Sequence, residues 1–450
     1  MDAVVRQHRR IIKTEEAGFF SCRFALSLAQ FSRIASQLWR QKIMYLWVSV
    51  FLIAAAMAWG QSEKPRFNQP PHSYWQRTPG DAFSQFATRV KAGQVQLDHT
   101  SEKMFVESLL KTLNISPASQ ILVFSTTSLQ LSRISVRNPR ALYFNDQTYV
   151  GYVPRGQIEV ISMDPYMGAV FHIFDIPRTA APPNIQRSTR CMNCHAGQDV
   201  GRVPVLLLKS VVSGPNGGSL DAFRLEDTGH GVPFKERFGG WHVTGKHAIK
   251  DHWGNLHGEL IAGDLRKIPA PPGRLFDWNR YPVSTSDILP HLVHEHQVGF
   301  VNRTVKAIYD TRHYLAAGKG KLSPEHAAEV AKSAGSIVRY ILFADEVPLP
   351  VGGVGGDPAF KADFLKRGRK TAAGTSLREF DLRTRLFKLR CSYMIHTPSF
   401  QGLPSVLKTA VLNSMRKALD TTHRDPAYVY LPTAEKSAIA NILKATLKGW

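Results

Sequence analysis

The chain has 450 residues, with 57 Lys and Arg against 35 Asp and Glu, so its formal net charge is +22 at pH 7. A charge this basic often indicates nucleic acid binding, but the sequence has no recognisable nucleic-acid-binding motif and no dense basic run, so we expect no nucleic acid partner. Only four cysteines are present, which excludes a fold held by a disulfide framework.

The first 60 residues read as a leader. Residues 43–60 run IMYLWVSVFLIAAAMAWG without a charge, follow Arg40 and Lys42, and end in small-residue patterns typical of signal peptide cleavage. Eighteen apolar residues are also at the short end for crossing a bilayer, so a retained anchor is the alternative. Either outcome places the rest of the chain outside the cytoplasm, in the periplasm or exported.

The next part is predicted to change from a linker to a β-rich region. Residues 61–100 are polar and contain prolines, so we expect a linker or arm, followed by a helix capped by Thr100 or Ser101. Short runs of aromatic and β-branched residues then predict strands. These runs are 121–124, 142–144, 149–153, 158–162 and 169–174, with a hairpin turn at 164–168.

Residues 191–195 read CMNCH, and chance would produce such a match on the order of one time in a thousand from four cysteines and 17 histidines. A thioredoxin-like dithiol is one alternative, although the preceding residues look like a loop rather than a strand. A zinc site would need a fourth ligand such as Cys391. Covalent haem c explains all three residues, with Cys191 and Cys194 forming thioethers and His195 binding the iron. Such attachment occurs outside the cytoplasmic membrane, which agrees with the leader.

The second half changes period. Further strands are predicted at 203–212, 241–243 and 258–262, and then helical patterns dominate. Helices are expected over 289–315, from Ser323-Pro324 onward, near 358–368, over 403–420, and from Thr433. The predicted class is α+β, with a β-rich haem-bearing region (101–270) followed by a mainly α-helical region (271–450) packed on it.

Several strings outside the haem motif resemble, in order, an uncharacterised family of exported bacterial single-haem c-type cytochrome proteins. They include RNPRALYFNDQTYVGYV (137–153), ERFGGWHVTGKH (236–247), DHWGN (251–255), LVHEHQ (292–297) and CSYMIH (391–396). The resemblance covers roughly residues 100–448 and implies one covalent haem and export. Trp253 stands where the family pattern usually has methionine, so that methionine is not available as a haem ligand.

The sixth iron ligand decides between an electron carrier and an enzyme, because two strong axial ligands favour electron transfer and an open face allows chemistry. His247 and His252 are the first candidates for this distal position. Met163, Met167, Met394 and His396 are further candidates, with core packing the ordinary alternative. His291, His294 and His296 invite a separate metal site, but three ordinary histidines on a helix are the default interpretation.

The leading hypothesis is an exported monohaem c-type cytochrome that transfers single electrons and meets an acidic redox partner or an anionic membrane surface through its basic charge. The alternatives are a haem-dependent oxidoreductase, peroxidase-like or oxidising a small molecule, and a haem sensor with an open sixth position. Asp345 and Glu346 are a candidate acid/base pair for an enzyme. Arginines near the motif and in the family strings are candidate partners of the haem propionates. They are Arg137, Arg140, Arg187, Arg190, Arg237, Arg383 and Arg385.

Overall fold

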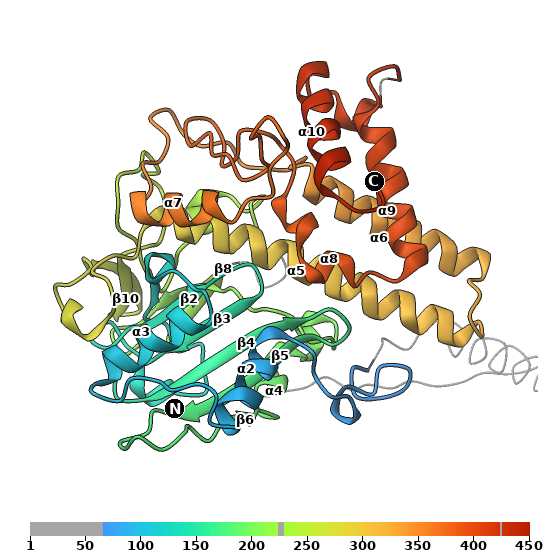
Figure 1. The fold of residues 1–450 in the computed structure, drawn as a ribbon. Coiled ribbons are helices and arrows are strands. Elements are labelled where there is room, and N and C mark those ends of the chain that lie inside the picture. The colour runs from blue at the N-terminus through green and yellow to red at the C-terminus, as the bar shows by residue number, and fades with distance from the viewer. Residues whose placement is uncertain (1–65, 224–228, 424) are drawn as a thin grey trace, which may run out of the picture. The chain divides into compact units, whose positions relative to one another are not determined.

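A computed structural model describes residues 66–223, 229–423 and 425–450 of the chain (Figure 1). The predicted leader, with its apolar segment 43–60, lies outside these ranges. None of the helices within them combines the length and apolar character needed to cross a bilayer. The described residues confirm an α+β fold in which an antiparallel sheet region is followed by a mainly helical half.

Seven strands among the described residues form one antiparallel sheet in the order β6-β5-β4-β3-β2-β1-β9. The strands are β1 (Ile121–Val123), β2 (Arg140–Phe144), β3 (Thr148–Tyr152), β4 (Gln157–Asp164), β5 (Gly168–Asp175), β6 (Gln186–Arg187) and β9 (Trp241–His242). Strands β2 to β5 form a meander of consecutive hairpins, as the short apolar runs and turn residues predict. Strand β9, from far along the chain, pairs with β1 through Trp241 and Val123.

One face of the sheet is covered by the helices α2 (Ala82–Lys91) and α3 (Glu102–Thr112). Phe83 and Phe86 of α2 pack with Phe174 and Val160 of the sheet in one buried cluster. The prediction that 61–100 forms a linker or arm is therefore corrected for the described part of that stretch. The signal in the sequence is the Asp81 cap, whose side chain accepts hydrogen bonds from the backbone at the start of α2.

The other face of the sheet is covered mainly by α5 (Ile288–Ala317), which runs across it in Figure 1. The expected helix over 289–315 is confirmed, and it is buried along most of its length. Further helices pack behind α5. Four of them agree with the predicted segments, namely α6 (Pro324–Ile341), α7 (Pro358–Lys366), α9 (Ser405–Leu419) and α10 (Thr433–Thr446), whereas the short α8 (Pro398–Gln401) was not predicted.

Two small hairpins complete the strands of the described residues. They pair β7 (Ser210–Ser213) with β8 (Ser219–Phe223) and β10 (Leu256–Ile261) with β11 (Asp264–Pro269). The strand predicted over 203–212 is thus confirmed only at its end, since residues 203–209 form no strand. Strand β11 was not predicted because its sequence, DLRKIP, is mostly exposed and lacks the alternation that marks a half-buried strand.

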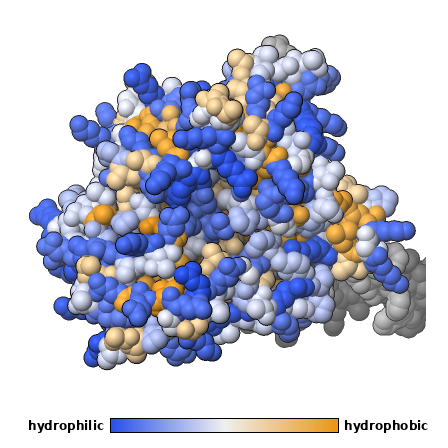
Figure 2. All heavy atoms as spheres, viewed as in Figure 1, coloured by the Kyte–Doolittle hydropathy of each residue, from blue (hydrophilic) through white to orange (hydrophobic). Residues whose placement is uncertain are grey.

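Figure 2 shows one face of the molecule, on which hydrophilic residues predominate and apolar residues gather in small separate groups. The large apolar side chains with the highest exposure include Val351, Val429 and Leu260. Contacts that this face offers to another macromolecule are therefore mainly polar, which suits recognition by charge.

The predicted turn at 164–168 closes the hairpin of β4 and β5, and Gly168 adopts a left-handed backbone with φ of 76°. A Cβ at Gly168 would lie 2.8 Å from the Pro204 carbonyl oxygen and 2.9 Å from Val305 of α5. Gly168→Ala should lower the free energy of unfolding by about 2 kcal/mol or more, through left-handed strain and the clash together. Urea denaturation of residues 61–450 measures the effect.

Gly93 provides the matched control, because its φ is 71° and no atom lies within 4 Å of its added Cβ. Gly93→Ala should cost about 1 kcal/mol, from backbone strain alone. Equal losses for the two variants would contradict the close packing of the turn against α5.

Buried histidines make stability depend on pH. Burial lowers the pKa of eight histidines outside the haem motif to between about 3 and about 4, against an ordinary value of 6.5. They are His72, His172, His242, His252, His291, His294, His296 and His396. Between pH 6.5 and 4 the unfolded chain therefore binds more protons than the folded one, and acid favours unfolding.

Two buried carboxyl groups act in the opposite direction, because burial raises the pKa of Glu295 and Glu346 to about 7. They favour folding as pH falls from 7 to 4.5, but the buried histidines with lowered pKa values outnumber them. The free energy of unfolding of residues 61–450 should therefore fall by at least about 2 kcal/mol per pH unit between pH 6 and 5. A urea midpoint that stays constant over this range would show that these histidines are not buried as described.

Candidate functional site

The Cys-x-x-Cys-His segment forms the short helix α4 (Met192–His195), with Cys191 at its N-terminal end. Cys191 is partly buried and its thiol donates to the Ser188 hydroxyl at 3.2 Å, whereas Cys194 is exposed. Burial raises the pKa of Cys191, and an attacking thiolate of a redox dithiol needs the opposite shift. The dithiol alternative is disfavoured, although the pair does lie on a short helix.

The His195 imidazole is held in one tautomer. Its Nδ1 lies 2.8 Å from the Val205 carbonyl oxygen, and since a carbonyl oxygen only accepts, Nδ1 carries the proton and Nε2 keeps its lone pair. The ring packs on Phe171 of β5, with 4.6 Å between centroids. Burial lowers the pKa of His195 to about 4. The side chain is therefore neutral near pH 7 and suited to bind a metal through Nε2.

The carbonyl that orients His195 is itself fixed by α5. The neighbouring residue Leu206 donates its backbone N–H to the Asn302 side-chain oxygen at 3.0 Å, and its carbonyl accepts from the Asn302 amide nitrogen at 2.9 Å. This pair of hydrogen bonds pins the irregular segment after α4 to the middle of α5. The position of His195 therefore depends on a contact between residues 96 positions apart.

The sheet face beneath α5 is incompletely covered. The side chains of β2 and β4 point alternately to the two faces of the sheet. Those that face α2 and α3 are fully buried, whereas some of those on the α5 side are only partly buried. We call four of these partly buried side chains the open strip. They are Arg140, Leu142, Glu159 and Ile161. Gly151 of β3, between Leu142 and Glu159 in the register, leaves the strip without a side chain at its centre.

One end of the open strip carries an ion pair, in which Arg140 contacts Glu159 at 2.7 Å. Glu159 also accepts hydrogen bonds from Ser128 and Gln130. The charges of Arg140 and Glu159 act on the pKa of both Cys191 and His195. The open strip and the Cys-x-x-Cys-His segment therefore face the same region.

These features meet the main requirements of a covalent haem. They comprise two thiols beside an imidazole with a free Nε2, partly exposed apolar side chains for the macrocycle, and the cations Arg140 and Lys209 for the propionates. Other predicted propionate partners are engaged elsewhere. Arg237 forms a buried pair with Glu295 at 2.9 Å, and Arg187 stacks on Tyr74 and Trp75.

The predicted distal candidates His247 and His252 lie together, with ring centroids 5.4 Å apart. His252 accepts a hydrogen bond from the Gly254 N–H and packs edge-on against Phe238. They follow Thr244, which is bonded to Ile288 at the start of α5. Asn302, which anchors the His195 segment, is fourteen residues further along α5, or about 21 Å.

The remaining predicted ligands lie in separate parts of the core. Met163 and Met167 are buried beside the β4–β5 turn, and Met394 is fully buried in the helical half. His396 lies 2.9 Å from the Thr446 hydroxyl through its Nε2. Of these four residues, Met163 shares the α5-side face of β4 with Ile161, because it lies two residues further along the strand.

The three histidines near the start of α5 point to different neighbours. His291 contacts the His242 carbonyl oxygen at 2.9 Å, His294 lies against Phe144 and Tyr149, and His296 pairs with His230 through their Nδ1 atoms at 2.9 Å. Within the described ranges, no group of three or more His, Cys, Asp or Glu side chains is placed to hold a metal ion. Those ranges include Cys391, so the zinc alternative is not supported.

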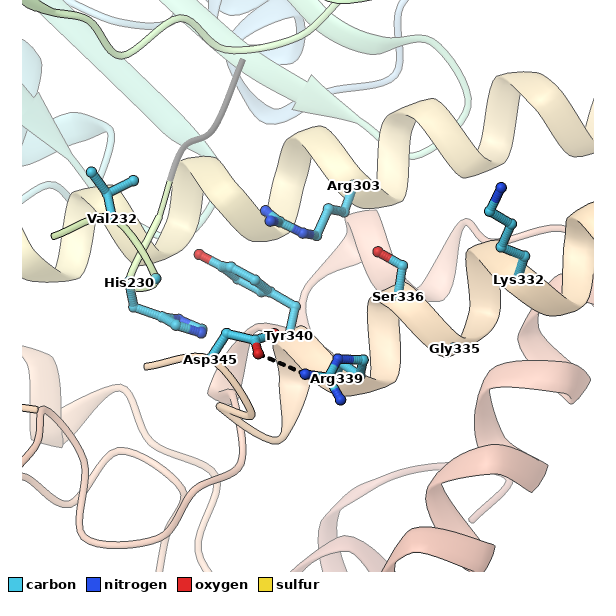
Figure 3. Close-up of a pocket in the computed structure, with 10 residues that line it drawn as sticks. His230, Val232, Arg303, Lys332, Gly335, Ser336, Arg339, Tyr340 and Asp345 are labelled. Atoms are coloured by element: carbon cyan, nitrogen blue, oxygen red, sulfur yellow. Dashed lines mark hydrogen bonds and ion pairs between the residues drawn. The ribbon is translucent and has the colours of Figure 1, made fainter. Parts of the chain in front are cut away.

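His230 also borders a separate pocket of about 540 Å³ between α5 and α6. Figure 3 shows Tyr340 between His230 and Arg303, with Lys332 and Ser336 along the same face of α6. The Tyr340 ring stacks on His230 at 4.1 Å, and the Arg303 guanidinium lies over its other side at 4.2 Å. The pocket is lined by more basic than acidic side chains.

The candidate acid/base pair does not act as a pair in this pocket. Asp345 is exposed and forms an ion pair with Arg339 at 2.6 Å, drawn as a dashed line in Figure 3. Glu346 turns to a different partner and accepts the Leu386 N–H at 3.0 Å. The two carboxyl groups therefore have separate structural roles.

Comparison of the chain with family models, with curated proteins and with solved structures finds no match. The family resemblance of its sequence strings therefore stays a prediction, and the site itself is the basis for inferring a function.

Proposed function

We propose that this protein is an exported monohaem c-type cytochrome that carries single electrons. The observation that carries the proposal is the His195 imidazole, whose Nδ1 is fixed on the Val205 carbonyl beside the two cysteines, so that Nε2 is free. Bound here, a haem iron would supply the exchange of one electron between its ferric and ferrous states. Cys191, Cys194 and His195 would hold the group, and the open strip would pack against it.

The surroundings of the motif support exchange with a partner at the surface. Cys194 and Arg190 are exposed, so a group attached at Cys194 would have one edge close to solvent. The chain from residue 61 onward retains a charge of +17, from 49 basic and 32 acidic side chains. An acidic redox partner is the class of protein that this charge attracts, and salt should weaken the encounter.

The attachment is tested by replacing both cysteines. Residues 61–450 exported in a host with a c-type haem maturation system should give a haem-stained band that survives denaturing electrophoresis. Cys191→Ala with Cys194→Ala should remove this band completely, because no thioether can form. Cys391→Ala is the matched control, since Cys391 is buried and distant in sequence, and its band should remain.

His195→Ala should alter the visible spectrum even where the band persists, because the thioethers do not require the imidazole. Retention of the band in the double cysteine variant, or an unchanged spectrum in His195→Ala, would contradict the assigned roles.

A further inference from the structure

We infer that His294 is the second axial ligand of the haem iron, opposite His195. This inference depends on the proposed function, because it concerns the haem assigned there. His294 lies on α5, six residues beyond its first residue, and its side chain is directed at the sheet rather than at solvent. The sequence pattern did not single it out, since neighbouring histidines of the same helix have other partners.

The sheet register places His195 and His294 over one row of residues. Phe171, Ile161, Tyr149 and Phe144 are direct neighbours across β5, β4, β3 and β2. His195 packs on Phe171 at one end of this row, and His294 packs on Tyr149 and Phe144 at the other, with centroid distances of 5.6 and 5.2 Å. Phe171 and Tyr149 are two strands apart, or about 10 Å.

Between these two positions lies Ile161, whose side chain is part of the open strip. The row is therefore covered by an imidazole at each end and only partly covered in the middle. A flat apolar group standing between the two imidazoles would cover Ile161 and complete the burial of this face.

The helix gives an independent measure of the same spacing. Asn302 anchors the segment that orients His195, and His294 lies eight residues earlier on α5, or about 12 Å along its axis. Eight residues also place the two side chains within about 80° of one another around the helix. The spacing of the strands and the position of His294 on α5 therefore both place His195 and His294 in the same region.

The immediate surroundings of His294 agree with this role. The side chain is 5 % exposed, and its Nδ1 is buried without a hydrogen-bond partner. Arg140 of the open strip acts on the pKa of both His294 and His195. A buried imidazole is more commonly bonded to a polar group, so the unpartnered nitrogen is compatible with a missing partner. Other histidines, including His247, share this feature, and the position of His294 over the sheet is therefore the stronger observation.

The rival candidates are less well placed. His252 packs edge-on against Phe238, and its Nδ1 already accepts the Gly254 N–H. Met163 shares the correct face of β4, but it is 1 % exposed and enclosed in the core cluster. Two imidazole ligands would hold the potential lower than an imidazole and a methionine, and would close the iron to external ligands.

The test uses haem-loaded residues 61–450, oxidised, reduced, and reduced under carbon monoxide. The wild type should show the electron paramagnetic resonance of a low-spin ferric haem with two imidazoles, and carbon monoxide should leave its reduced spectrum unchanged. His294→Ala should lose that resonance and bind carbon monoxide. His294→Met should remain closed to carbon monoxide, with a midpoint potential shifted upward.

His291→Ala is the matched control, because His291 is also a buried imidazole of α5 but is bonded to the His242 carbonyl. Its resonance should be unchanged. His252→Ala and Met163→Leu test the rivals. If the iron of His294→Ala does not bind carbon monoxide, the inference is wrong. It is also wrong if the wild type binds carbon monoxide or lacks the two-imidazole resonance. The wild-type measurement does not depend on the folding of any variant.

A closed iron in His294→Ala, or a wild type without the two-imidazole resonance, would leave both covalent haem and electron transfer standing. A wild type that binds carbon monoxide would leave covalent haem standing but would favour a haem enzyme or sensor over an electron carrier. Wild-type protein without covalent haem would instead refute the proposed function.

Discussion

The hydrogen bond from His195 Nδ1 to the Val205 carbonyl is the contact on which the candidate site depends. It selects the tautomer, and it also decides where Nε2 points. Val205 lies in an irregular segment that is held from two sides, by the hydrogen bonds between Asn302 and Leu206 and by the Ala169 N–H, which donates to the Pro204 carbonyl oxygen. A four-residue helix alone could not orient an imidazole so closely, and the long helix α5 supplies the rigidity.

The same constraint explains why the chain is larger than a small haem-carrying domain needs to be. The sheet provides a flat face, α2 and α3 bury its other side, and α5 spans the face that contains the open strip. In a chain with this many buried aliphatic and aromatic side chains, a partly exposed Leu142 and Ile161 in the middle of a sheet are exceptions. Covering them is worth roughly 25 cal/mol for each Å² of apolar surface removed from water, and a bound macrocycle would supply that cover.

Much of this arrangement could be predicted from the sequence, for identifiable reasons. The meander from β2 to β5 follows from aromatic and β-branched runs separated by turn residues, and α6 follows from Ser323 and Pro324 at its start. The Cys-x-x-Cys-His segment stood out because two cysteines and a histidine at this spacing are improbable by chance and predict covalent haem. Strand β11 and helix α2 were missed, because the first has an exposed polar sequence and the second lies in a stretch that looks like a linker.

The distal side of the site could not be predicted in the same way. His294 differs from His291 and His296 only in which neighbours surround it, and those neighbours come from β2 and β3, more than 140 residues earlier. His247 and His252 stood out because they follow the haem motif closely in a glycine-rich stretch, yet proximity in sequence did not place them beside His195. Ligand assignment needed the register of the sheet and the length of α5 together.

Covalent attachment of one haem is best tested by intact mass spectrometry of residues 61–450, purified after export with a c-type haem maturation system. We expect one species, heavier than the polypeptide by the mass of a single haem, and proteolysis should leave this mass on the peptide that contains Cys191 and Cys194. A polypeptide of unmodified mass, with both thiols free to alkylate under the same conditions that mature a known c-type cytochrome, would contradict this expectation.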